Sequence, residues 1–140
     1  MPADAGRVFF DSNTLLYLIS KDFEKAHLIR TRLSDRGTIS VQVLNEFTNV
    51  ARRKHRLTID QIQPVLSDLR QVLDVVPLTI EVHDAGLRLI RRYGLSTYDA
   101  MIVAAAMGAG CDTVLSEDMQ HGMLIDGKLR IVDPFASAAG

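Results

Sequence analysis

Tryptophan is absent from this sequence of 140 residues, and cysteine occurs once, as Cys111. A single thiol cannot form an intramolecular disulfide bond, so nothing in the chain requires an oxidising compartment. It also argues against a zinc site built from several thiolates. We therefore expect a cytoplasmic protein in which Cys111 is a small buried residue rather than a nucleophile.

Long apolar segments are lacking as well. The longest run without a polar side chain covers residues 100–111, whereas a membrane-spanning helix needs about 20 residues. Residues 1–6 contain no basic segment followed by an apolar one, so no secretion signal is expected. The sequence therefore predicts a protein without a membrane partner.

Neither sign of charge dominates, because 16 Lys and Arg residues face 17 Asp and Glu residues, for a net charge of −1. Hydrophobic residues make up 47% and charged residues 24%, as in ordinary globular proteins. A chain of this length suits one domain with its own core. We expect a single domain over residues 1–140, with an ordered core at about 8–135 and short flexible tails.

Short apolar runs alternate with longer amphipathic segments along the chain. The short runs predict five strands, at residues 7–10, 38–41, 75–78, 113–115 and 129–132. The longer segments predict helices at residues 23–36, 43–55, 58–74, 82–93 and 98–108. The last helix is apolar nearly all round and should be buried, whereas Pro64 should kink the third or delay its start. This alternation predicts an α/β fold, with a mostly parallel sheet of about five strands flanked by helices.

Four acidic residues occupy positions where such a fold gathers functional groups. Asp11 directly follows the first strand, and Asp118 comes just after the fourth. Asp99 lies in the first turn of the buried helix, and Glu46 borders the apolar stripe of an amphipathic helix. Because ligands of parallel sheets bind beyond the carboxyl ends of the strands, we expect these four side chains to converge there.

Each acid also has a simpler explanation. Asp11 and Asp99 could cap helices, and Asp118 could be an ordinary turn residue. Glu46 is harder to explain in this way, because a partly buried glutamate needs a partner. Four converging carboxylates would repel one another unless a cation lay among them, and oxygen ligands select Mg²⁺ or Mn²⁺. The chemistry that uses such a cluster is phosphoryl transfer to metal-activated water.

Four short motifs carry these acids: VFFDSN at residues 8–13, VLNEF at 43–47, YDA at 98–100 and LSEDM at 115–119. Their order and spacing resemble the four-acid pattern of PIN-domain ribonucleases. Within that superfamily the chain is similar to VapC-type toxins, including its tail at residues 116–122 and 131–135. The resemblance covers about residues 8–135.

The resemblance implies a PIN-like three-layer sandwich and a Mg²⁺- or Mn²⁺-dependent endoribonuclease that hydrolyses phosphodiester bonds in structured RNA, such as transfer RNA or ribosomal RNA. It also implies a homodimer and a VapB-type antitoxin that blocks the site and binds operator DNA. The catalytic and metal-binding residues that it implies are Asp11, Glu46, Asp99 and Asp118, with Asn13 and Ser116 in support. Glu117 could share the metal or face solvent, and we favour solvent. Asp133 stands where the family commonly has asparagine, in a segment that we expect to be structural.

The densest basic run covers residues 52–56 and ends the helix that carries Glu46. Cations at a helix carboxyl end complement the helix dipole, so a solvated helix end is one explanation. The other is that Arg52, Arg53 and Arg56 bind RNA phosphates. With the four site acids set aside, 16 basic residues face 13 acidic ones, so the remaining surface is mildly basic. No aromatic residue interleaves with the run, so we expect recognition of RNA shape rather than base stacking.

Two alternatives remain open. A catalytically silent domain could bind RNA or a protein partner without cleaving anything. A phosphatase-like α/β enzyme would use a strand-end aspartate as nucleophile, but it normally has a second aspartate two residues later, where this chain has Asn13. The four histidines show no ligand spacing, and we expect them to be structural or on the surface, with His121 the first exception to consider.

Overall fold

The computed structural model describes residues 7–136, so nearly all of the predicted tails lie outside the described residues. These residues form one six-stranded sheet in the order β3-β2-β1-β4-β6-β5. All neighbouring strands are parallel except β5 and β6, which are antiparallel. The strands are β1 (Val8–Phe10), β2 (Gly37–Ser40), β3 (Leu73–Val76), β4 (Thr113–Leu115), β5 (Leu124–Ile125) and β6 (Leu129–Val132).

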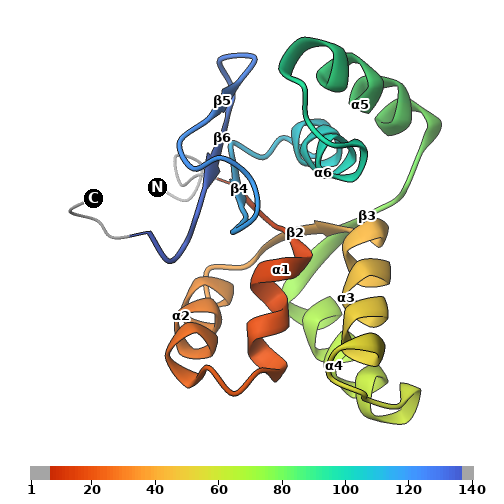
Figure 1. Ribbon diagram of the computed structural model, residues 1–140, viewed down its shortest axis with the longest axis vertical. Coiled ribbons are helices and arrows are strands. Elements are labelled where there is room, and N and C mark those ends of the chain that lie inside the picture. Colours follow the sequence, from red (N-terminus) through yellow and green to blue (C-terminus); the bar gives the residue numbers. More distant parts are fainter. Residues whose placement is uncertain (1–6, 137–140) are drawn as a thin grey trace.

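Helices cover both faces of the sheet, as the sequence pattern predicts, and give the three layers that the family resemblance implies. Figure 1 shows α5 and α6 together on one side of the strands and α1 to α4 on the other. The helices are α1 (Ser12–Leu15), the 3₁₀ helix η2 (Leu16–Ile19), α2 (Phe23–Leu33), α3 (Val41–Arg53), α4 (Ile59–Val72), α5 (Ile80–Tyr93) and α6 (Thr97–Gly108). None of them, within residues 7–136, is long and apolar enough to cross a membrane.

Buried apolar residues explain why these elements pack as they do. Phe9 and Phe10 of β1 are fully buried, as expected for a strand at the centre of a sheet that is covered on both faces. Every residue of α6 from Ala100 to Ala106 is buried too, which confirms the central helix predicted from its uniform hydrophobicity. The core thus holds β1 and α6 in place; Asp11 directly follows β1, and Asp99 lies in the first turn of α6.

Several element boundaries differ from the prediction. A capping box formed by Thr58 and Gln61 starts α4 at Ile59, so the later start predicted from Pro64 is wrong. The helix runs continuously through Pro64 and passes without a loop into β3, because Leu73 both ends α4 and begins the strand. The short elements α1, η2 and β5 were not predicted, because they are too short to show a periodic pattern.

The topology brings the carboxyl ends of β1 and β4 side by side. From β1 the chain passes to β2 on one side, and it later returns to β4 on the other. This reversal of strand order is where parallel α/β sheets bind ligands. Asp11 and Ser116 are the first residues after these two strands.

Candidate active site

Asp11 is held rigidly at the end of β1. Its backbone N–H donates to the carbonyl of Leu115 at 2.9 Å, which continues the pairing with β4. One carboxylate oxygen, Oδ1, accepts a hydrogen bond from the backbone N–H of Ser12 at 2.8 Å and caps α1. The other, Oδ2, accepts from the Ser116 hydroxyl at 2.9 Å and from the Asn13 amide at 3.2 Å. Asp11 therefore caps α1. The same hydrogen bonds also fix the orientation of its carboxylate, and the residue is only 4% exposed.

Glu46 of α3 is linked to Asp11 through Ser12, which forms a hydrogen bond with each of these two acids. The Ser12 hydroxyl donates to Glu46 Oε1 at 3.2 Å, and the Gln42 amide donates to Glu46 Oε2 at 3.3 Å. The same Gln42 nitrogen lies 3.3 Å from the carbonyl oxygen of Tyr98, the residue before Asp99. Ser12 and Gln42 thus join α1, α3 and α6 around the acidic groups.

Asp99 does not cap α6, because the Ser96 hydroxyl accepts the hydrogen bond from the backbone N–H of Asp99 at 3.4 Å. The capping explanation for this residue is therefore wrong. The Asp99 carboxylate is half-buried in the first turn of the helix, where the helix dipole favours a negative charge.

The carboxylates of Asp11 and Glu46 are close enough to neighbouring acids for those charges to affect their ionisation. Burial raises the pKa of Asp11 from 3.8 to about 7; hydrogen bonds from Ser116 and Ser12 oppose the rise, and the negative charges of Glu46 and Asp99 add to it. Burial also raises the pKa of Glu46, and the charge of Asp99 adds to this effect. Within residues 7–136 no lysine or arginine forms an ion pair with any of the three.

Asp118 lies at the solvent-exposed rim of this group. Its backbone N–H donates to the Ser116 hydroxyl at 3.3 Å, and that hydroxyl in turn donates to Asp11. Asn13 strengthens the link, because its amide nitrogen lies 3.3 Å from Ser116 Oγ and its carbonyl oxygen accepts the backbone N–H of Glu117 at 3.1 Å. The polar residues predicted to support the first and fourth acids thus bind the two segments together.

The Glu117 side chain is only 28% exposed and has two hydrogen-bond donors, so the prediction that it simply faces solvent is wrong. Its carboxylate accepts hydrogen bonds from the Tyr17 hydroxyl at 2.6 Å and from Lys25 Nζ at 2.9 Å. Burial alone would raise the pKa of Glu117, but these two donors outweigh it and lower the pKa. Lys25 Nζ also lies over the rings of Tyr17 and Phe135, at 4.8 and 4.6 Å from their centroids. Glu117 is therefore engaged in an ion pair beside the site.

The acidic group suits a divalent cation by its chemistry. Its donors are all carboxylate oxygens, the ligands that Mg²⁺ and Mn²⁺ prefer, and the pKa of Asp11 is raised chiefly by burial, with the negative charges of Glu46 and Asp99 adding to the rise. As the side chains stand, no three acidic, histidine or cysteine residues in the described part of the chain are grouped tightly enough to surround an ion. Asp11, Glu46 and Asp99 are the residues that would hold a cation, with Asp118 at the rim.

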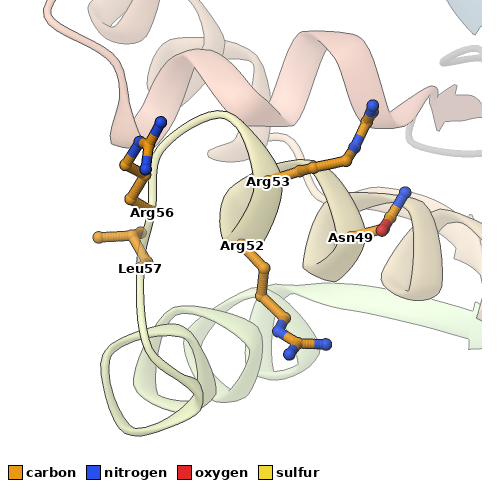
Figure 2. A pocket seen from close by; sticks show the side chains of 5 residues that line it. All are labelled: Asn49, Arg52, Arg53, Arg56 and Leu57. Carbon is orange, nitrogen blue, oxygen red and sulfur yellow. The ribbon is translucent and has the colours of Figure 1, made fainter.

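The three predicted RNA-binding arginines lie together at the end of α3. A cavity of about 510 Å³, which we call the arginine pocket, is lined by Asn49, Arg52, Arg53, Arg56 and Leu57. Figure 2 shows Arg53 and Asn49 extending in the same direction, whereas Arg52 extends the other way. All three arginines are exposed, so their charges are available to a ligand.

Other residues singled out in the sequence have structural roles. The His121 imidazole accepts the backbone N–H of Asp133 through Nδ1 at 3.0 Å. The Asp133 carboxylate in turn accepts the N–H of Phe135 at 2.9 Å, which makes it a turn-forming residue. Cys111 is 6% exposed, as predicted for a small core residue.

Sequence reasoning missed three neighbours of the site. Gln42 stands four residues before Glu46, a spacing that places both on one helix face and could have revealed it. Ser12 gave no signal of its contact with Glu46, because the two residues are 34 positions apart in the sequence. Lys25 gave no signal, because it is distant in sequence from Glu117 and only the folded chain brings the two together.

Known proteins with this architecture were found by comparison. No curated protein sequence matches the chain. Among solved structures, the toxin-antitoxin complex from Klebsiella pneumoniae has a chain with 21% identity and a TM-score of 0.69, with 91% of this chain and 98% of that chain covered. The DNA-bound VapBC from Salmonella typhimurium gives 22% identity, a TM-score of 0.68 and coverage of 91% and 97%.

A third structure, the VapC20 toxin from Mycobacterium tuberculosis, gives 17% identity, a TM-score of 0.63 and coverage of 79% and 89%. At these identities the three likenesses establish a common fold. A model of the PIN domain family matches residues 8–121, which is more than half of the chain and includes all four acids. The chain therefore belongs to the PIN domain family.

Proposed function

We propose that this PIN domain is a Mg²⁺- or Mn²⁺-dependent endoribonuclease and the toxin of a VapBC-type toxin-antitoxin pair. The observation that carries the proposal is the grouping of Asp11, Glu46 and Asp99 at the carboxyl edge of the sheet, where burial, with the charge of Asp99 adding to it, raises the pKa values of Asp11 and Glu46. A fold would not gather buried negative charge without compensation unless a ligand supplied the positive charge. The VapC and VapBC structures of the same fold support this interpretation.

Each residue has a definite task in the proposed reaction. Asp11 presents a carboxylate oriented by Ser116 and Asn13, while Glu46 and Asp99 approach from two separate helices. The bound cation would activate a water molecule and stabilise the leaving oxygen of the phosphodiester bond. Asn13 holds the segment that carries Asp118 against Asp11. Arg52, Arg53 and Arg56 supply positive charge for the RNA backbone.

Asn13 also bears on the phosphatase-like alternative. Such an enzyme would need a second acid at this position, but the Asn13 amide nitrogen donates to the Asp11 carboxylate. Asn13 therefore orients Asp11 and cannot act as a second acid. The alternative of a catalytically silent, RNA- or partner-binding domain predicts binding without cleavage, so the activity test separates it from the nuclease.

Partners and surroundings belong to the same proposal. VapC20 is described as a toxin that cleaves the sarcin-ricin loop, and we propose structured RNA, such as ribosomal or transfer RNA, as the substrate here. Two of the similar structures are toxin-antitoxin complexes, one of them bound to DNA, which supports a VapB-type antitoxin as partner. A homodimer in the cytoplasm remains our prediction, and light scattering of the purified protein tests the dimer.

The test is cleavage of total cellular RNA by the purified protein, with the new ends mapped by sequencing. We expect cleavage with Mg²⁺ or Mn²⁺, none in EDTA, and recovery when excess Mn²⁺ is restored. Asp99→Asn should abolish cleavage with the fold intact, whereas Asp84→Asn, an exposed change on α5, should cleave normally. Cleavage that persists in chelator, or in Asp99→Asn with metal present, would refute the proposed mechanism.

A further inference from the structure

A second cavity opens directly beside the candidate active site. It measures about 650 Å³, within the range of roughly 300–1,000 Å³ that is usual for ligand sites. We call it the tyrosine pocket. Its lining includes Glu46 and the hydrogen-bonded Ser12 beside it. Asn45 and Asn49 line it from the exposed side of α3, and Tyr98 lines it from the start of α6.

Tyr98 is the most unusual residue of this pocket. Its side chain is 68% exposed, although a large aromatic ring normally packs against other residues. Its backbone is nevertheless tied to the site, because its carbonyl accepts the Gln42 amide and the next residue is Asp99. Leu78, itself 49% exposed, adds a second apolar group to the lining. A flat ring exposed to water beside an acidic site offers a stacking surface for a planar ligand.

The polar groups of the pocket suit the edge of a nucleobase. Asn45 and Asn49 are exposed, and each side-chain amide carries both a donor and an acceptor. Proteins recognise unpaired RNA bases by this combination of an aromatic face and hydrogen-bonding side chains. Among the residues that line this pocket, Glu46 has the only charged side chain, so the lining suits a neutral base better than an anionic group.

Helix α3 connects this pocket to the arginine pocket. Gln42, Glu46, Asn49 and Arg53 follow one another at intervals of four, three and four residues, so they lie on one face of the helix. Asn49 lines both pockets, and Figure 2 shows its side chain parallel to that of Arg53. From Glu46 to Arg53 the helix rises by about 10 Å, roughly the length of three stacked nucleotides at about 3.4 Å each.

We propose that the tyrosine pocket binds one unpaired nucleobase of the RNA, stacked on Tyr98 beside the cleaved bond, and that the adjoining strand follows α3 toward Arg53. The proposal rests on the ribonuclease function proposed above and adds a determinant of its specificity. It also replaces the expectation of recognition by RNA shape without stacking, because Tyr98 lies next to the basic helix in space and far from it in sequence.

The test uses a short single-stranded RNA that spans a cleavage site mapped with the wild-type protein, with 2-aminopurine next to the cleaved bond. Binding is measured in an Asp11→Asn background, which prevents cleavage. Loss of one stacked base weakens binding by roughly 5- to 140-fold, and for exposed Tyr98 we expect Tyr98→Ala to weaken it about tenfold. Tyr98→Phe should bind within about twofold of the parent, since the ring remains. Phe23→Ala removes an aromatic ring that is 74% exposed and lines neither pocket, so it serves as the matched control and should bind like the parent.

Stacking has a signature that a structural role for Tyr98 would not produce. The fluorescence of 2-aminopurine should fall on binding to the parent and to Tyr98→Phe, but not to Tyr98→Ala at saturating protein. In the active background, Tyr98→Ala should also lose preference for the nucleotide next to the cleaved bond. If the wild-type protein cleaves RNA and Tyr98→Ala shows the same affinity, quenching and preference, the base site is refuted and the nuclease proposal stands. If the wild-type protein neither binds nor cleaves RNA with Mn²⁺, both proposals fail.

Discussion

The ionised side chain of Asp11 should destabilise the metal-free protein, so Asp11→Asn should be more stable than the parent at pH 8. Burial, reinforced by the charges of Glu46 and Asp99, raises the pKa of Asp11 from 3.8 to about 7. A raised pKa means that the folded protein holds this proton more tightly than the unfolded chain does. The resulting penalty is absent below pH 3.8, grows as the pH rises to about 7, and is complete above that value.

The magnitude follows from the pKa and the hydrogen bonds. The gap between 3.8 and about 7 corresponds to roughly 4 kcal/mol, at about 1.36 kcal/mol per pKa unit. Asparagine has only one acceptor oxygen, so if that oxygen accepts from Ser116 and Asn13, its amide nitrogen faces the Ser12 N–H, and the lost hydrogen bond costs about 1–2 kcal/mol. The net gain at pH 8 is therefore about 2–3 kcal/mol, or roughly 6–9 °C in melting temperature. At pH 4 the folded parent is protonated, and the variant should be the less stable of the two.

The assay is urea unfolding in EDTA at several pH values between 4 and 8. Asp84→Asn is the matched control, because Asp84 is exposed on α5 and its replacement should change stability by less than about 0.5 kcal/mol. Adding Mg²⁺ or Mn²⁺ at pH 8 should stabilise the parent more than Asp11→Asn, since the cation relieves the repulsion that the variant lacks. A difference between parent and variant that does not change with pH would refute the reasoning.

Three further predictions concern the surroundings of the site. Gly37→Ala would place a Cβ atom 2.6 Å from the fully buried ring of Phe10, so it should lower the free energy of unfolding by about 1–3 kcal/mol in urea. A double-mutant cycle with Lys25→Met and Glu117→Gln should give a coupling of about 0.5–1 kcal/mol, because the pair is partly exposed; zero coupling would contradict the 2.9 Å ion pair. Since the pKa of Glu117 is lowered, this contribution should be present above pH 4.5 and disappear as the pH falls further. Arg53→Ala should weaken RNA binding and reduce the slope of log K against log salt by about 1, and an unchanged slope would place the RNA elsewhere.

Much of the fold was predictable because its signals are local. The apolar runs at Thr113–Leu115 and Leu129–Val132 became β4 and β6 with the predicted bounds, and uniform hydrophobicity predicted the burial of α6. The positions of Asp11 and Asp118 after strands followed from the same patterns. The boundary between α4 and β3 was harder to predict, because apolar residues continue from the end of the helix into the strand. The strand was predicted at residues 75–78, but it begins at Leu73.

The surroundings of the site were less predictable, because they depend on contacts between distant segments. Glu117 and Lys25 are separated by 92 positions, and nothing near either residue indicates an ion pair. Tyr98 similarly stands 56 positions from Gln42, so its place beside the basic helix follows only from the packing of α6 against the sheet. Sequence patterns indicated which residues carry the chemistry, but not which residues surround them.

The direct passage from α4 into β3 has a mechanical consequence. Without an intervening loop there is no hinge at Leu73, so α4 cannot swing away from the molecule without pulling on the outermost parallel strand. Inserted residues should therefore be poorly tolerated at this junction and better tolerated in the connection that precedes Thr58. Any opening of this part of the protein should begin at that connection, with α4 and β3 moving as one rigid body.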